Sequence, residues 1–125
     1  RKYSDSRLSQ RALREIYLKA FEIIVREEQP WAIMSSYNVV NGRRASESRE
    51  LLTAILRDEW GYAGLVMSDW WTRGEHYKEL LAGNDLKMAN GYPERVEEAM
   101  KLGAVNRSSL EICAERVLKL ILRIH

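Results

Sequence analysis

Residues 65–71 read LVMSDWW, an apolar run that ends in a carboxylate and two adjacent tryptophans. The run 65–68 is too short for a helix and is bounded by Gly64 and Asp69, which predicts a buried strand. An ionised carboxylate after a buried strand needs a solvent-filled cleft or a charged partner, because burial of an unpaired charge is very unfavourable. The stretch therefore predicts a central strand and makes Asp69 a candidate functional group at its end.

Two other short apolar runs predict further strands. Residues 31–36 have the length of a strand and lead into residues 38–42, whose Asn-Gly pair is typical of a loop. Residues 86–88 can form a third, very short strand.

Elsewhere in the chain, apolar residues recur at helical spacing. Ser9 can cap the first helix and Pro30 stops it, whereas either Asn106 or Ser108 can cap the last one. The expected helices cover about residues 9–28, a segment through 51–56 that Gly61 ends, a short piece at 80–81 before Gly83, a segment from Pro93 to Gly103, and a final helix with an apolar stripe over 110–121.

This alternation of strands and helices predicts the α/β class, with parallel strands joined by right-handed crossovers. Helices on one side cannot cover both faces of a parallel sheet, so the segment is expected to be a slice of a larger structure. In such folds the active site lies beyond the carboxyl ends of the strands, where Asp69 is expected.

Composition is that of one ordinary folded domain. Of the 125 residues, 46% are hydrophobic and 30% are charged, and no apolar run approaches the length of a membrane span. The net charge of +2 comes from interleaved residues and does not favour nucleic acid as a partner. Cys113 is the only cysteine, and its apolar helical position indicates a small buried side chain. The sequence begins at Arg1 without a signal-like segment, which leaves periplasmic, secreted and cytoplasmic locations open.

Trp70 and Trp71 can wall a cleft beside Asp69. Sugars present flat patches of C–H groups to aromatic faces, and their hydroxyl groups need fixed polar partners, so this combination suits a carbohydrate subsite. The alternative is that Asp69 caps the following helix while the tryptophans fill the core, and residue types alone leave both possibilities open.

The segment after the preceding strand favours the first possibility. Met34, Tyr37 and Asn38 are placed to reach the same rim, so two strand ends would contribute to one mouth. Asn38 and Asn41 are also ordinary turn formers, and a structural role for them stays open.

Four motifs stand in order along the chain: RALREIYLKAFE at 11–22, MSSYNVVNG at 34–42, LRDEWGYAGLVMSDW at 56–70 and AGNDLKM at 82–88. Together they resemble glycoside hydrolase family 3, the β-glucosidase family, over nearly the whole length of the chain. The resemblance implies that residues 1–125 are part of the N-terminal TIM-type (β/α)8 barrel domain, about its last three strand-helix units. The rest of the barrel and the C-terminal domain would lie outside these residues.

The resemblance also implies roles. Asp69 of the SDW motif would be the catalytic nucleophile of a retaining glycosidase and would form a covalent glycosyl-enzyme intermediate. Trp70 would line the subsite for the glycone, and Met34 and Tyr37 match positions that border the same sugar. Arg1, by its offset from RALREIYL, matches an arginine that binds sugar hydroxyl groups.

Other members of the family's site are implied to lie elsewhere. They are an upstream Asp and Lys-His pair that bind the glycone, and the acid/base glutamate of a later domain. Glu75 is a carboxyl group near Asp69, but it is expected to be exposed to solvent. His76 and His125 are expected at the surface and form no metal site, because two lone histidines lack companion ligands. No cofactor or metal is implied.

The leading interpretation is a piece of a retaining β-glycosidase that hydrolyses terminal β-D-glucosides. Without general-acid help, which contributes ~10²–10⁴-fold, the isolated piece is expected to lack turnover. Its open edges are expected to make it dimerise, swap elements or repack its helices. The SDW form and the MSSYNVVNG loop fit the β-glucosidase branch better than the β-N-acetylhexosaminidase branch. A β-xylosidase or α-arabinofuranosidase of the same family, or a non-catalytic α/β interaction module, are the alternatives.

Overall fold

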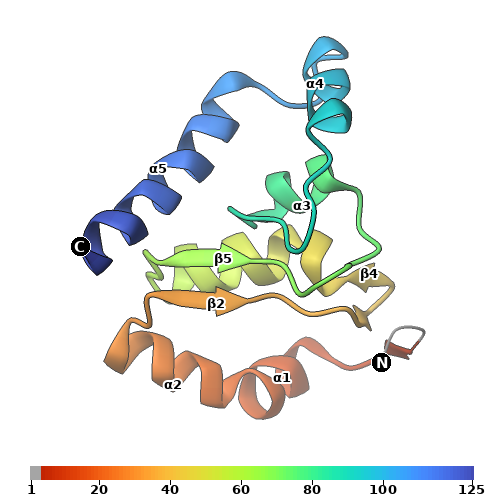
Figure 1. Cartoon of the computed structure of the whole chain (residues 1–125). Helices are drawn as coiled ribbons and strands as arrows, with labels where there is room; N and C mark the ends of the chain where they lie inside the picture. Colours follow the sequence, from red (N-terminus) through yellow and green to blue (C-terminus); the bar gives the residue numbers. More distant parts are fainter. Residues whose placement is uncertain (1–3) are drawn as a thin grey trace.

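The computed structural model describes residues 4–125, and two parallel strands run through its centre (Figure 1). Strand β2 (Ala32–Met34) pairs with β5 (Leu65–Met67) so that Ala32 lies beside Leu65 and Met34 beside Met67. Leu65 and Val66 are buried, as expected for a strand covered on both faces. The predicted parallel pairing is confirmed, and the chain has an α/β structure.

The expected third strand at 86–88 is reduced to a single parallel bridge between Met67 and Leu86. Two backbone hydrogen bonds support it, from Ser68 N to Leu86 O at 2.9 Å and from Leu86 N to Val66 O at 3.3 Å. The pairing stops there because Met88 N donates to the Ser68 hydroxyl at 2.9 Å rather than to a backbone carbonyl. A side chain thus takes the place of the next ladder bond.

A small second sheet forms where only a loop was expected. Strand β3 (Val39–Val40) lies between β1 (Asp5–Ser6), which is parallel to it, and β4 (Arg43–Arg44), which is antiparallel. Asn41 and Gly42 join β3 to β4 with positive φ angles of 50° and 83°, as two-residue hairpin turns require. The predicted loop at 38–42 is therefore wrong at residues 39–40, which form a strand, while residues 41–42 are a turn.

The first predicted helix is confirmed with a widened turn in it. It comprises α1 (Gln10–Ala12), η1 (Leu13–Tyr17) and α2 (Lys19–Glu28). Ser9 caps it, since its hydroxyl accepts a hydrogen bond from Ala12 N at 3.1 Å. In η1 the Leu18 N–H reaches back five residues to Leu13 O at 2.8 Å, which is the wider π-type spacing.

The remaining helices follow the predicted order, except that the short helix η2 was not predicted. They are η2 (Ala45–Glu47), η3 (Glu50–Glu59), α3 (His76–Ala82), α4 (Pro93–Lys101) and α5 (Arg107–Ile124). Pro93 occupies the first position of α4, where its missing N–H leaves no bond unmade. Asn106, one of the two predicted caps, begins α5 and accepts from Ser109 N at 2.9 Å.

The hydrophobic core lies where α2 and η3 cover the two strands (Figure 1). Its members are Val25, Leu52, Ile55, Leu56, Trp60, Tyr62, Val66 and Ala82. Cys113 of α5 is buried as predicted, and burial raises the pKa of its thiol to about 11. By contrast, large apolar side chains remain exposed on α2 and α5, among them Ile24 and Leu122. Within residues 4–125, no helix has both the length and the apolar character needed to cross a bilayer.

Candidate functional site

The carboxyl ends of β2 and β5 meet at one edge of the sheet, which we call the rim. Met34 ends β2 and is 55% exposed, and Ser35 N after it donates to Met67 O at 2.8 Å. Ser68 and Asp69 follow β5 directly. The in-register parallel pairing therefore brings Met34 and Asp69 to the same side of the molecule, as the sequence predicted.

Asp69 does not cap a helix. Helix α3 begins only at His76, after Glu75, whereas Asp69 Oδ1 accepts from the adjacent Trp70 N at 2.7 Å. Trp70 and Trp71 are 47% and 66% exposed, so neither indole fills the core. The structural alternative for this motif, a cap followed by core tryptophans, is wrong.

Tyr37 connects the two sides of the rim. Its hydroxyl donates a hydrogen bond to the Trp70 carbonyl, so the segment after β2 touches the loop after β5. The Trp70 and Trp71 rings lie 5.7 Å apart between centroids and are tilted by 59°. A carboxylate, a tyrosine and two exposed indoles thus stand together, which is chemistry suited to a ligand with hydroxyl groups and apolar faces.

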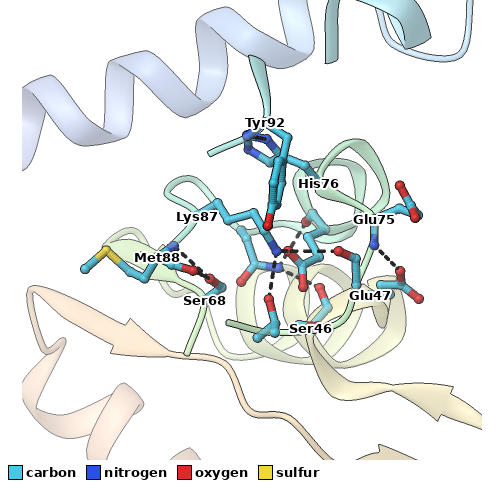
Figure 2. A network of polar contacts seen from close by, with 12 residues as sticks. Ser46, Glu47, Ser68, Glu75, His76, Lys87, Met88 and Tyr92 are labelled. Atoms are coloured by element: carbon cyan, nitrogen blue, oxygen red, sulfur yellow. Dashed lines mark hydrogen bonds and ion pairs between the residues drawn. The ribbon is translucent and has the colours of Figure 1, made fainter. Parts of the chain in front are cut away.

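A network of polar contacts, most of them buried, includes residues next to the rim (Figure 2). The Ser68 hydroxyl is completely buried; it donates to Asp69 O at 3.0 Å and accepts from Met88 N. The Asn84 amide accepts from the Ser35 hydroxyl at 2.7 Å and donates to Ser46 O at 2.6 Å. These bonds fix Ser68, which precedes Asp69, and Ser35, which follows Met34.

The centre of that network is an ion pair that the sequence analysis missed. Lys87 and Glu79 have side chains only 4% and 1% exposed, and their charged atoms are in hydrogen-bond contact. Lys87 Nζ also donates to Thr72 Oγ1 at 2.8 Å. The available signal was a lysine between Leu86 and Met88, in a run otherwise suited to a buried strand.

A polar pocket of about 290 Å³ lies next to the rim. Its lining residues are Trp71, Thr72, Arg73, Gly74, Glu75, Lys87, Met88, Asn90, Tyr92 and Arg95, and Asp69 is not among them. Glu75 is half exposed and forms an ion pair with Arg95 at 3.4 Å, in line with the expected solvent exposure. The pocket therefore flanks the carboxylate rather than containing it.

The prediction that His76 lies at the surface is wrong, because this residue is half-buried. Its Nδ1 accepts from Tyr92 N at 3.1 Å, and burial lowers the pKa of the imidazole. His125 is exposed as expected. Within residues 4–125 there is no group of three or more His, Cys, Asp and Glu side chains that could hold a metal ion.

The remaining predicted residues have other places. Asn41 holds the hairpin turn to the N-terminal segment, with its amide bonded to both Leu8 N and Leu8 O at 3.0 Å, so its role here is structural. Asn38 accepts from the Ser36 hydroxyl at 2.6 Å. Arg1 lies outside the described residues.

Curated proteins similar to this chain include two named glycosidases. Beta-glucosidase A of Butyrivibrio fibrisolvens is 64% identical over 111 residues, which are 89% of this chain and 13% of that protein. Exo-alpha-(1->6)-L-arabinopyranosidase of Bifidobacterium breve is 43% identical over 118 residues, which are 94% of this chain and 16% of that protein. The chain thus spans less than a fifth of the length of these relatives.

A solved structure shares the fold. β-glucosidase 3B from Thermotoga neapolitana in complex with glucose aligns with a TM-score of 0.92 at 40% identity, over 98% of this chain and 18% of that one. The fold and the rim define an α/β protein with its polar groups at the carboxyl ends of parallel strands. Within that class, the chain belongs to glycosyl hydrolase family 3, because residues 2–120 match the model of its N terminal domain.

Proposed function

We propose that residues 1–125 are part of the (β/α)8 barrel of a retaining β-glycosidase, and that the intact protein hydrolyses terminal β-D-glucosides. The observation that carries the proposal is Asp69, a carboxylate at the end of a central parallel strand, bordered by an exposed indole in a chain of this family. Strands β2 and β5 and the bridge at Leu86 would be consecutive strands of the barrel. The exposed faces of α2 and α5 would pack against the remainder of the barrel domain.

In the proposed mechanism, Asp69 is the nucleophile. An oxygen of its carboxylate attacks the anomeric carbon, and the bond from that carbon to the leaving oxygen breaks as a general acid protonates the oxygen. Water then attacks the same carbon and releases Asp69, with the general acid now acting as base, so the product keeps the anomeric configuration. The acid/base group would come from another domain, since Glu75 is engaged with Arg95.

Trp70, Met34 and Tyr37 would border the glycone. Exposed apolar atoms of Trp70 and Met34 can cover the C–H faces of a sugar ring, while Tyr37 holds the Trp70 backbone in place. Arg1 would add donors to sugar hydroxyl groups. The relatives' names include both a glucosidase and an arabinopyranosidase, so a pentose in place of glucose is the second candidate substrate.

The chain on its own is proposed to be inactive and to self-associate as a dimer, or to require the rest of the barrel. It carries one carboxylate of the required pair, and exposed apolar residues such as Phe21, Ile24, Leu118 and Leu122 lie on its outer helices.

The test is covalent trapping in the intact protein that contains this chain. A 2-deoxy-2-fluoro-β-glucoside with a good leaving group should glycosylate the nucleophile and form a slowly hydrolysed glycosyl ester, and peptide mass mapping should find the label on Asp69. Asp69→Ala should abolish both labelling and hydrolysis while leaving the thermal unfolding temperature nearly unchanged. Label on another residue, or hydrolysis by the alanine variant, would exclude the proposed role. Absence of labelling with any glycoside would favour a non-catalytic module.

A further inference from the structure

Residues 69–75 form a loop without helix or strand between β5 and α3, and this loop carries Asp69 and Trp70. Its two ends have attachments of their own. Near the start, the Trp70 carbonyl accepts from the Tyr37 hydroxyl, and at the end Glu75 N donates to Glu47 Oε1 at 2.8 Å. The middle of the loop needs a separate anchor, because irregular backbone has no internal ladder to hold it.

The Lys87 ammonium group is that anchor (Figure 2). It donates to Thr72 Oγ1 at 2.8 Å, to Gly74 O at 3.5 Å and to Glu79 Oε2. An ammonium group has three N–H donors, so all of them are directed at the 69–75 loop or at the helix that follows it. Lys87, which follows α3 in the chain, thus links the 69–75 loop to α3 in the buried interior.

Glu79 completes the arrangement from α3. Its carboxylate is packed against Gly74, where an added Cβ would lie only 2.7 Å from Glu79 Cδ. Its Oε1 atom has no hydrogen-bond partner among the described residues. The Lys87–Glu79 pair is therefore packed against the 69–75 loop, and its position depends on the loop keeping this conformation.

Lys87 is also coupled to Asp69 through its neighbour in sequence. Met88 N donates to the Ser68 hydroxyl at 2.9 Å, and that hydroxyl donates to Asp69 O at 3.0 Å. Residues 87 and 88 consequently hold the backbone before Asp69 and the loop after it. A rotation of the loop about Asp69 would have to break contacts on both sides.

Stability alone gives a weak reason for such a pair. Desolvation of two charges offsets most of their attraction, and apolar replacements of buried pairs are often neutral or stabilising. What an apolar pair cannot supply is a set of directional bonds to the loop. A nucleophile, in contrast, needs its geometry fixed closely, since a displacement of about 1 Å can reduce a rate by about 10²-fold.

We propose that Lys87 is a positioning residue for the reaction proposed above: paired with Glu79, it fixes the 69–75 loop and with it the orientation of Asp69 and Trp70. The inference rests on the proposed function, because a positioning role for Lys87 has a purpose only if Asp69 is the nucleophile. Lys87 acts through Thr72 and Gly74 and makes no contact with substrate.

The test uses covalent trapping by the 2-deoxy-2-fluoro-β-glucoside in the intact protein, which separates binding of the reagent from the rate constant of the chemical step. Thr72→Val keeps the shape of residue 72 but removes the acceptor for Lys87, whereas Thr72→Ser keeps the acceptor. We expect trapping to be about 10-fold slower for Thr72→Val and nearly normal for Thr72→Ser. Lys87→Met should slow it by about 10²-fold, with the apparent dissociation constant changed by less than about 3-fold.

A role in stability alone predicts a different result. In that case Lys87→Met combined with Glu79→Leu, which makes the pair apolar, would restore both the unfolding temperature and the trapping rate. We expect the double variant to recover the unfolding temperature but to remain about 10²-fold slow. Lys119→Met, at the exposed Lys119–Glu115 pair, is the matched control and should trap at the wild-type rate.

The outcomes separate the two proposals. Normal trapping rates in Thr72→Val and in the double variant, with the wild-type protein labelled on Asp69, would overturn the positioning role and leave the proposed function standing. Failure of the wild-type protein to be labelled on Asp69 overturns both. If Lys87→Met does not fold, the Thr72→Val and Thr72→Ser pair still decides the question.

Discussion

Two buried ionic clusters lie at opposite ends of strand β5, and they are built for different purposes. At the amino end, the Asp85 carboxylate is completely buried and accepts from Arg57 at 2.8 Å, Arg116 at 2.9 Å and Val66 N at 2.8 Å. These donors belong to η3, α5 and β5, so the Asp85 cluster joins regular elements to one another. At the carboxyl end, the Lys87–Glu79 pair joins one helix to an irregular loop.

From this contrast we expect one cluster to serve mainly stability and the other mainly the geometry of the loop. Removal of Asp85 would leave two guanidinium groups without a counter-charge, one of them only 8% exposed. Apolar replacement of both Lys87 and Glu79 would mainly release the 69–75 loop, because no buried charge is left unpaired and α3 keeps its other packing. The Asp85 cluster should therefore control unfolding, and the Lys87–Glu79 pair should control the rate of chemistry at Asp69.

The largest effect on stability is expected for Asp85→Ala. Leaving Arg57 buried without its partner should destabilise the intact protein by about 3–5 kcal/mol, measured as a shift of the urea unfolding midpoint. Trapping at Asp69, measured per folded molecule, should stay within about 3-fold of wild type, since sites without shared partners act independently. Glu115→Ala, in an exposed pair of α5, is the control and should shift the midpoint little. A slow trapping rate in Asp85→Ala would contradict the separate roles assigned to the Asp85 cluster and the Lys87–Glu79 pair.

A smaller effect on stability is expected for Gly74→Ala, which tests the Lys87–Glu79 pair at the carboxyl end of β5 by a steric clash. The new Cβ would meet Glu79 Cδ at 2.7 Å, so the loop or the ion pair must move. Overpacking of this kind destabilises by about 1–3 kcal/mol, and the trapping rate should fall as well. Gly91→Ala is the matched control, because its Cβ would meet only the His76 ring at 3.4 Å. Wild-type trapping by Gly74→Ala would show that the loop tolerates displacement there.

The smallest effect concerns the pH dependence of stability and involves His76, the first residue of α3. Burial lowers the pKa of His76, so the folded state favours the neutral imidazole while the unfolded state titrates near about 6.5. As the pH falls through that value, the unfolded state binds the proton more readily, and stability decreases. His76→Gln should therefore lose less in unfolding temperature than wild type between about pH 7.5 and about pH 5.5. Exposed His125→Gln should behave as wild type; equal acid sensitivity of all three proteins would contradict this role of burial.

The sequence was sufficient for features whose cause is local. Ser9 and Pro93 begin helices, and Asn106 does so as one of the two caps considered, because a short polar side chain or a missing N–H satisfies the first turn and nothing remote is needed. The strand before Asp69 was predictable for a similar reason, since a short apolar run between Gly64 and an acid has few other uses. Residue types alone did not decide whether the tryptophans beside it are exposed or buried, because that depends on what packs against them in three dimensions.

Features that depend on distant partners were not predictable. Strand β3 forms because residues 5–6 lie beside it, although the Asn-Gly pair preceded by two valines was a hairpin signal that could have been used. The bond from Lys87 to Glu79 joins a strand end to a helix face, and only the three-dimensional arrangement reveals it. His76 was misplaced for the same reason, because its burial depends on Tyr92 folding back over it.

The adjacent indoles of Trp70 and Trp71 give the rim an optical signature of its own. Their centroids are 5.7 Å apart, close enough for their electronic transitions to couple, and both rings are in contact with solvent. Trp60, in contrast, is enclosed by the core and should emit at shorter wavelength whatever happens at the surface. Trp31 is also 48% exposed, so changes in the red part of the intrinsic fluorescence, or in the near-ultraviolet dichroism, of a Trp31→Phe variant would report events beside Asp69 without any added dye.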